Sequence, residues 1–161
     1  MKALVVYDSF FGNTEKVAQA IGAALAAHGD VEILRAGDLK PEDLVDLTVL
    51  AVGSPTRQFR PSGATSEFLK GIPKQGLNGV KVAAFDTRFT EQEIKGTSGV
   101  LAFFVGIFGY AAEPISKKLE KKGGDVVMPP EGFYVDGVEG PLQEGELERA
   151  AEWAVQILAG H

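Results

Sequence analysis

Three short apolar runs constrain the fold of this chain more than any other feature. Residues 3–7 read ALVVY, residues 48–52 read TVLAV and residues 80–85 read VKVAAF. A strand with one face in water alternates apolar and polar residues, whereas a nearly continuous apolar run is typical of a strand covered on both faces. The runs therefore predict a parallel sheet with helices on both sides, an α/β fold.

The remaining segments complete an alternation of strands and helices. Strands are expected over Ala3–Tyr7, Val31–Leu34, Thr48–Val52, Val80–Phe85 and Asp125–Met128, the last interrupted by Pro129-Pro130 and resumed over Phe133–Val135. Helices are expected over Thr14–His28, Pro41–Leu47, Ala64–Gly71, Tyr110–Lys122 and Glu146–Leu158, with Leu147 and Trp153 on the buried stripe of the last helix. Because crossovers between parallel strands are right-handed, this order predicts a doubly wound sheet.

Length and charge narrow the class of protein. The 161 residues suit one domain, residues 1–161. The net charge is −6, which argues against nucleic acid and anionic membranes as partners. Between Glu131 and Glu152, seven acidic residues stand against Arg149 alone, so this stretch is either a solvated helix face or a docking surface for a basic partner.

Other absences exclude several kinds of site and of targeting segment. The chain has no cysteine, which excludes disulfides, thiolate metal sites and a cysteine nucleophile. The start MKALVVYD is too short for a signal peptide, and the uncharged run Gly96–Ala112 is shorter than a membrane span. A cytoplasmic protein is therefore expected, and neither histidine has neighbours that suggest a metal site or catalysis.

In a doubly wound sheet, ligands bind beyond the carboxyl ends of the strands. The loops after the first, third and fourth of the five expected strands are therefore the candidate site. The first loop consists of Asp8, Ser9, Phe10, Phe11, Gly12, Asn13 and Thr14. It leads directly into a helix, whose free N–H groups and dipole favour an anion. No lysine or arginine lies in this loop, so a phosphate there would be held by neutral donors; the alternative is a plain turn capped by Asn13.

The other two loops can flank a planar ring. The loop after the third strand contains Ser54, Pro55, Thr56, Arg57 and Phe59, and the loop after the fourth contains Asp86, Thr87, Arg88 and Phe89. Two aromatic side chains facing one crevice can stack on the two sides of a ring. Arg57, Arg60 and Arg88 would place positive charge near the ring, bind a carboxylate or phosphate, or simply lie on the surface.

These motifs resemble those of short-chain flavodoxins. The segment YDSFFGNTEKVAQAI is similar to the phosphate loop of the flavodoxin family, and GSPT and FDTRF resemble its two flavin-flanking loops. The resemblance implies a three-layer fold with strand order 2-1-3-4-5 and noncovalently bound FMN. It assigns Ser9 and residues 12–14 to the phosphate, with Phe10 and Phe11 in the same loop. Residues 54–57 with Phe59 would line one side of the ring, and residues 86–89 the other.

Three functions follow from the resemblance. The first is an electron carrier that accepts electrons from a reductase and passes them to an acceptor protein. The second is an FMN-dependent NAD(P)H:quinone reductase, because GSPTRQF is similar to the GTPTR-type loop of that group. The third is a flavin-free interaction module, suggested by Phe10-Phe11 and by the apolar segment Gly96–Ala112. That segment is expected to be either a buried helix or an exposed patch that forms a homodimer or binds a partner.

Overall fold

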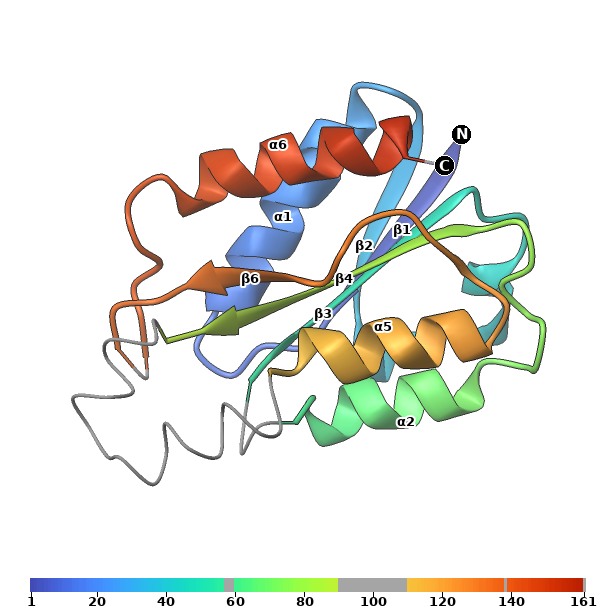
Figure 1. Ribbon diagram of the computed structural model, residues 1–161, viewed down its shortest axis with the longest axis horizontal. Helices are drawn as coiled ribbons and strands as arrows, with labels where there is room; N and C mark the ends of the chain where they lie inside the picture. The colour runs from blue at the N-terminus through green and yellow to red at the C-terminus, as the bar shows by residue number, and fades with distance from the viewer. Residues whose placement is uncertain (57–59, 90–109, 138, 161) are drawn as a thin grey trace.

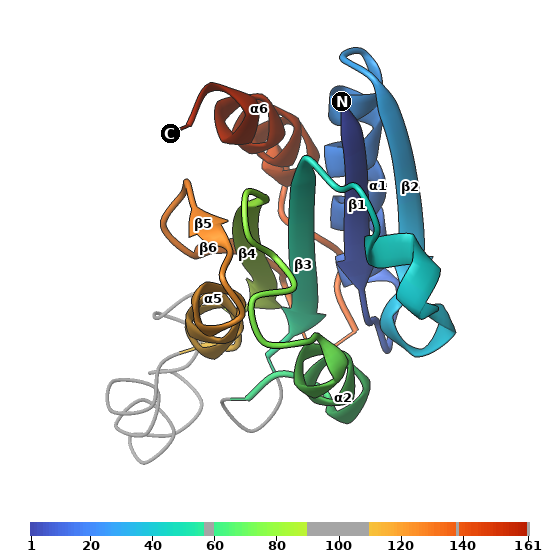
Figure 2. The same ribbon diagram turned by 90° about the vertical axis from the view of Figure 1, so that its right-hand side faces the viewer.

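A single parallel sheet forms the middle of the molecule (Figures 1 and 2). The computed structural model describes residues 1–56, 60–89, 110–137 and 139–160. The sheet runs in the order β2-β1-β3-β4-β5 and every neighbouring pair is parallel. Its strands are β1 (Lys2–Tyr7), β2 (Asp30–Arg35), β3 (Val49–Pro55), β4 (Lys81–Arg88) and β5 (Asp125–Val126). The predicted α/β class and the implied strand order are both confirmed.

Helices cover both faces of the sheet, as the continuous apolar strands predict. On one face lie α1 (Asn13–Ala26) and α6 (Glu146–Ala159), and on the other lie α2 (Gly63–Gly71) and α5 (Ala112–Lys121). Alternate residues of each central strand point to opposite faces. In β1, for example, Val5 belongs to the core under α1 and α6, whereas Leu4 and Val6 belong to the core under α2 and α5.

The edge of the sheet next to β4 is built from two short strands. After β5 the chain passes Pro129-Pro130, and β6 (Glu131–Tyr134) then pairs with β4 in parallel, further along the same edge. Proline has no N–H to donate to a ladder, so the pairing is interrupted there. The predicted interruption is confirmed, although β6 begins at Glu131, two residues earlier than expected.

Two local expectations are wrong. The helix expected over Pro41–Leu47 is instead a single 3₁₀ turn, η2 (Pro41–Leu44), which follows another 3₁₀ turn, η1 (Ala36–Asp38). The chain leaves η2 before Asp46, whose φ is +60°. Leu147 is 40% exposed rather than buried. The buried stripe of α6 consists of Glu146, Ala150, Trp153, Ala154 and Ile157, and Leu147 lies on its flank.

The prediction for Trp153 is correct. Its indole packs edge-on against Phe85 of β4, with ring centroids 5.9 Å apart, and against Phe133 of β6, with centroids 6.0 Å apart. These three rings join α6 to the strands that lead toward the candidate site. Edge-to-face packing of this kind contributes beyond the burial of apolar area.

Candidate functional site

The three predicted loops meet at the carboxyl ends of β1, β3 and β4. The N–H of Asp8 donates to the carbonyl of Gly53 (3.2 Å), which joins the first loop to β3. The N–H of Thr56 donates to the carbonyl of Thr87 (3.1 Å), which joins the second loop to the third. The hydroxyls of Thr14 and Thr87 lie 2.8 Å apart and close the ring of contacts. The prediction that these three loops meet at one edge of the sheet is therefore confirmed.

The loop between β1 and α1 presents unused backbone donors. Gly12 precedes the helix at φ +88°, and a side chain there would meet no atom within 4 Å. The first intrahelical bond runs from the N–H of Lys16 to the carbonyl of Gly12, so the amides of residues 13–15 precede it. The hydroxyl of Ser9 accepts from the N–H of Gly12 (3.0 Å), which leaves its own proton for an acceptor. No side chain caps α1, whereas Ser62 caps α2.

The side chains of Asn13 and Thr14 are already engaged within the protein. Thr14 is buried and its hydroxyl is bonded to Thr87, while Asn13 donates through Nδ2 to the carbonyl of Glu139 (3.1 Å). The backbone of Gly140 packs directly against Asn13: a Cβ added to Gly140 would lie 2.5 Å from Asn13 Oδ1. These side chains hold the first turn of α1 in place, and its backbone amides are the groups left to bind an anion.

Phe10 and Phe11 lie at the tip of the same loop. They are 46% and 54% exposed, respectively. Met1, Val45, Leu147 and Val155 are exposed to a similar extent, so exposure alone does not mark the two rings as ligand contacts. Whether either ring contacts a bound ligand stays a prediction.

The second loop begins with a serine that serves the fold. Ser54 is fully buried; its hydroxyl donates to the carbonyl of Pro55 (3.0 Å) and accepts from the N–H of Ser62 (2.9 Å). It therefore fixes the start of α2 from the end of β3. Pro55 and Thr56 are half-buried, and the predicted ring contacts Arg57 and Phe59 lie outside the described residues.

Asp86 and Arg88 form an ion pair behind the third loop. Arg88 donates through Nε and Nη2 to the two carboxylate oxygens of Asp86, at 2.6 and 2.7 Å, and the N–H of Ala112 donates to Asp86 Oδ2 at 2.9 Å. Burial raises the pKa of Asp86, although Arg88 opposes the shift. Burial lowers the pKa of Arg88, but the hydrogen bonds and charge of Asp86 outweigh it, so that pKa is raised.

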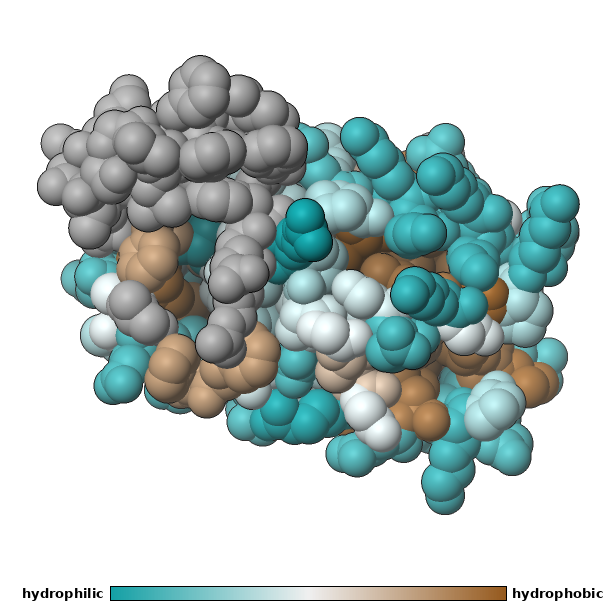
Figure 3. Space-filling view, turned by 90° about the horizontal axis from the view of Figure 1, so that it is seen from below, coloured by the Kyte–Doolittle hydropathy of each residue, from teal (hydrophilic) through white to brown (hydrophobic). Residues whose placement is uncertain are grey.

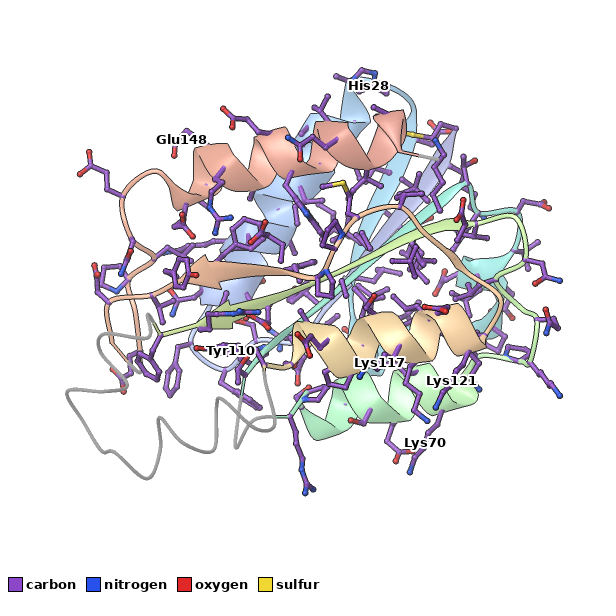
Figure 4. The ribbon with its side chains drawn as sticks, in the orientation of Figure 1. His28, Lys70, Tyr110, Lys117, Lys121 and Glu148 are labelled. Carbon is purple, nitrogen blue, oxygen red and sulfur yellow. The ribbon has the colours of Figure 1, made fainter. Side chains whose placement is uncertain are left out.

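This pairing balances the charge of Arg88, which counts against the alternative in which Arg88 brings free positive charge to the ring. Its guanidinium also lies 3.7 Å from the ring centroid of Tyr110, which Figure 4 shows just before α5. The side chain of Asp86 is fully buried. Of the other predicted residues, Phe89 is half-buried, and Arg60 is exposed.

Sequence reasoning missed three contributors to this edge. Arg35, at the end of β2, bonds to Asp8 and Ser9 at the start of the first loop. The Glu139-Gly140 turn bonds to Asn13, and Tyr110 covers Arg88. Of these three, only Arg35 could have been inferred from the sequence. In a parallel sheet of this order the ends of β1 and β2 are neighbours, and the register pairs Tyr7 with Arg35.

Charge is distributed unevenly around the sheet. Lys70, Lys117 and Lys121 lie on α2 and α5, and Glu148 lies on α6, across the sheet (Figure 4). Figure 3 shows the face formed by α2 and α5, where hydrophilic side chains alternate with hydrophobic areas in the described part. Arg149 pairs with both Glu131 (3.1 Å) and Glu146 (2.7 Å), so its one positive charge balances one of the two negative charges.

The described residues contain neither a cluster of side chains suited to a metal ion nor a helix long and apolar enough to cross a membrane. Residues 96–109 of the apolar segment lie outside the described residues, so the homodimer prediction is untested.

Comparison with known proteins agrees with this geometry. The family model described as flavodoxin matches residues 5–153. A flavodoxin structure from the domain Archaea has 25% identity and a TM-score of 0.73, covering 99% of this chain and 97% of that chain. Flavodoxin 1 from Bacillus cereus has 16% identity and a TM-score of 0.76, covering 99% and 98%, which shows the shared fold.

One longer relative also matches. An NADPH-dependent diflavin oxidoreductase 1 from Emericella nidulans is 30% identical over 137 residues, which is 79% of this chain but only 18% of that protein. The family model covers most of the chain, and the fold is the one that the resemblance implies. The chain belongs to the flavodoxin family, whose cofactor is FMN.

Proposed function

We propose that residues 1–161 form one domain that binds FMN noncovalently and carries electrons between redox proteins. The observation that carries this proposal is the loop from Ser9 to Thr14. It combines a left-handed Gly12, an uncapped helix N-terminus and no basic side chain, at the point where β1, β3 and β4 end. This donor set fits a phosphate monoester bound through neutral N–H and O–H groups.

The described residues support the cofactor from two sides. At the phosphate end, the amides of residues 13–15 and the hydroxyl of Ser9 supply donors, while Asn13 and Thr14 hold that turn rigid. At the ring end, Pro55, Thr56 and Phe89 would line the flavin together with Arg57 and Phe59. The bound flavin supplies one- and two-electron chemistry, and the protein sets its exposure and environment.

An acidic rim beside the phosphate loop supports docking of a basic partner. Asp136, Glu139 and Glu144 are exposed in the segment between β6 and α6, and Asn13 binds the backbone of this segment. Complementary charge at such a rim accelerates association and orients the partner. The fungal relative is by name NADPH-dependent, which supports a flavoprotein reductase as the electron donor.

The first experiment is an absorption spectrum of the purified protein before and after addition of FMN. We expect flavin bands and tight one-to-one binding, with riboflavin binding more weakly because it lacks the phosphate. A protein that neither contains nor binds FMN would refute the proposal and favour the interaction module.

A second experiment separates the carrier from the quinone reductase. The holoprotein is mixed with NADPH and a quinone, with and without an NADPH-dependent flavoprotein reductase. A carrier turns over only when the reductase is present, whereas a quinone reductase consumes NADPH without it. The pairing of Arg88 with Asp86 favours the carrier, because it removes one of the three arginines that could have held a nucleotide phosphate.

A further inference from the structure

Arg35 connects the edge strand of the sheet to the phosphate loop. It is the last residue of β2 and is in register with Tyr7, the last residue of β1. Its Nη1 donates to Asp8 Oδ1 (3.2 Å) and to the carbonyl of Ser9 (3.0 Å). The guanidinium also lies 5.2 Å from the ring centroid of Tyr7. One side chain therefore holds both the carboxylate and the backbone at the point where the loop begins.

The carboxylate of Asp8 would otherwise oppose binding of an anion. Its side chain is only 12% exposed, and it lies one residue before Ser9, whose N–H donates to Asp8 Oδ1 (2.9 Å). Like charges in a partly desolvated position repel strongly. Arg35 supplies the positive charge that compensates Asp8, and no other described cation pairs with this carboxylate.

The backbone contact matters for geometry. The hydroxyl of Ser9 accepts from the N–H of Gly12, so the orientation of Ser9 determines how the loop enters α1. Arg35 holds the carbonyl of Ser9 from β2, while the N–H of Asp8 is held by Gly53 from β3. The loop is thus fixed from both neighbouring strands.

We propose that Arg35 is a positioning residue for phosphate recognition: it neutralises Asp8 and fixes the Ser9 carbonyl, so that the donors of the loop converge on a dianion. This inference rests on the proposed FMN function. It concerns the phosphate and not the ring, and it assigns to Arg35 a role in distinguishing FMN from riboflavin.

The test compares the affinities of FMN and riboflavin for Arg35→Gln, Arg35→Lys, Asp8→Asn and the double variant Asp8→Asn/Arg35→Gln. Lys74→Gln, which removes an exposed cation from the turn before β4, controls for net charge. Arg35→Gln should weaken FMN about tenfold, the order expected when a charge-assisted hydrogen bond is lost, and leave riboflavin nearly unchanged. Arg35→Lys should recover part of the loss, because lysine keeps the charge but not the planar guanidinium that lies against Tyr7.

The double variant should bind FMN better than Arg35→Gln, because the unpaired carboxylate is gone. Equal weakening of FMN and riboflavin, or no change in either, would overturn the role of Arg35. If Arg35→Gln does not fold, Arg35→Lys and the double variant carry the same comparison. Failure of the wild-type protein to bind FMN would instead refute the proposed function itself, so the two failures are distinguishable.

Discussion

Gly12 and Gly145 allow the role of the phosphate loop to be separated from its effect on stability. Both precede a helix, both have φ +88°, and a side chain at either would meet no atom within 4 Å. In the folded protein, alanine at either position is therefore destabilised by the left-handed backbone conformation and by no steric clash. That cost is roughly 1–2 kcal/mol, offset in part by the lower entropy of the unfolded chain.

We expect Gly145→Ala to lower the free energy of unfolding of the FMN-free protein by about 1 kcal/mol, and Gly12→Ala to lower it by less, because its empty loop escapes part of the strain. Only Gly12→Ala should weaken FMN. Its loop can relax toward a right-handed backbone when empty, and binding must then restore the strained form. A cost of about 1.4 kcal/mol corresponds to a tenfold loss of affinity.

The assay is a titration of FMN fluorescence with each variant, together with urea unfolding of the FMN-free proteins. Gly145 begins α6 and belongs to none of the three predicted loops, so it is a matched control. The reasoning fails if the two variants bind FMN equally well, because the strain at Gly12 would then be irrelevant to the cofactor.

Three other predictions address the ion pairs and the ring. Arg88→Met leaves the carboxylate of Asp86 buried without its ion-pair partner, so the free energy of unfolding should fall by about 3–5 kcal/mol. Adding Asp86→Asn should recover most of this loss. A decrease below about 1 kcal/mol, measured by urea unfolding, would contradict the importance of the ion pair. Although burial opposes the shift, hydrogen bonds from Arg149 lower the pKa of Glu146. The ionised carboxylate of Glu146 therefore stabilises the fold above its ordinary pKa of 4.5, and this stabilisation is lost as the pH falls through the lower pKa of the folded state. In Glu146→Gln the free energy of unfolding should depend less on pH over this range. Parallel curves of unfolding free energy against pH for the variant and the wild type would refute the prediction. Phe89→Ala should weaken FMN and riboflavin alike, by about 1–2 kcal/mol of stacking, and unchanged affinities would remove Phe89 from the site.

Much of the site's location was accessible from the sequence, but the tasks of its side chains were not. The loops of Asp8, Ser54 and Asp86 were correctly expected to meet, because parallel strands end at one edge. The prediction that Ser54 and Asp86 line the ligand stays a prediction. In the structure Ser54 starts α2 and Asp86 pairs with Arg88, so both face the protein.

The sequence by itself determined the layers of this protein and the edge of the sheet at which the three candidate loops meet. Strands such as ALVVY and VKVAAF must be covered on both faces, and periodicity is enough to specify that. Only the tertiary structure decided which groups of the candidate loops form hydrogen bonds with one another and with the rest of the protein. Arg35 reaches Asp8 across 27 positions of the chain, and Ala112 reaches Asp86 across 26. A hydrogen bond depends on distances within a few tenths of an ångström, whereas residue patterns specify only which face a side chain occupies.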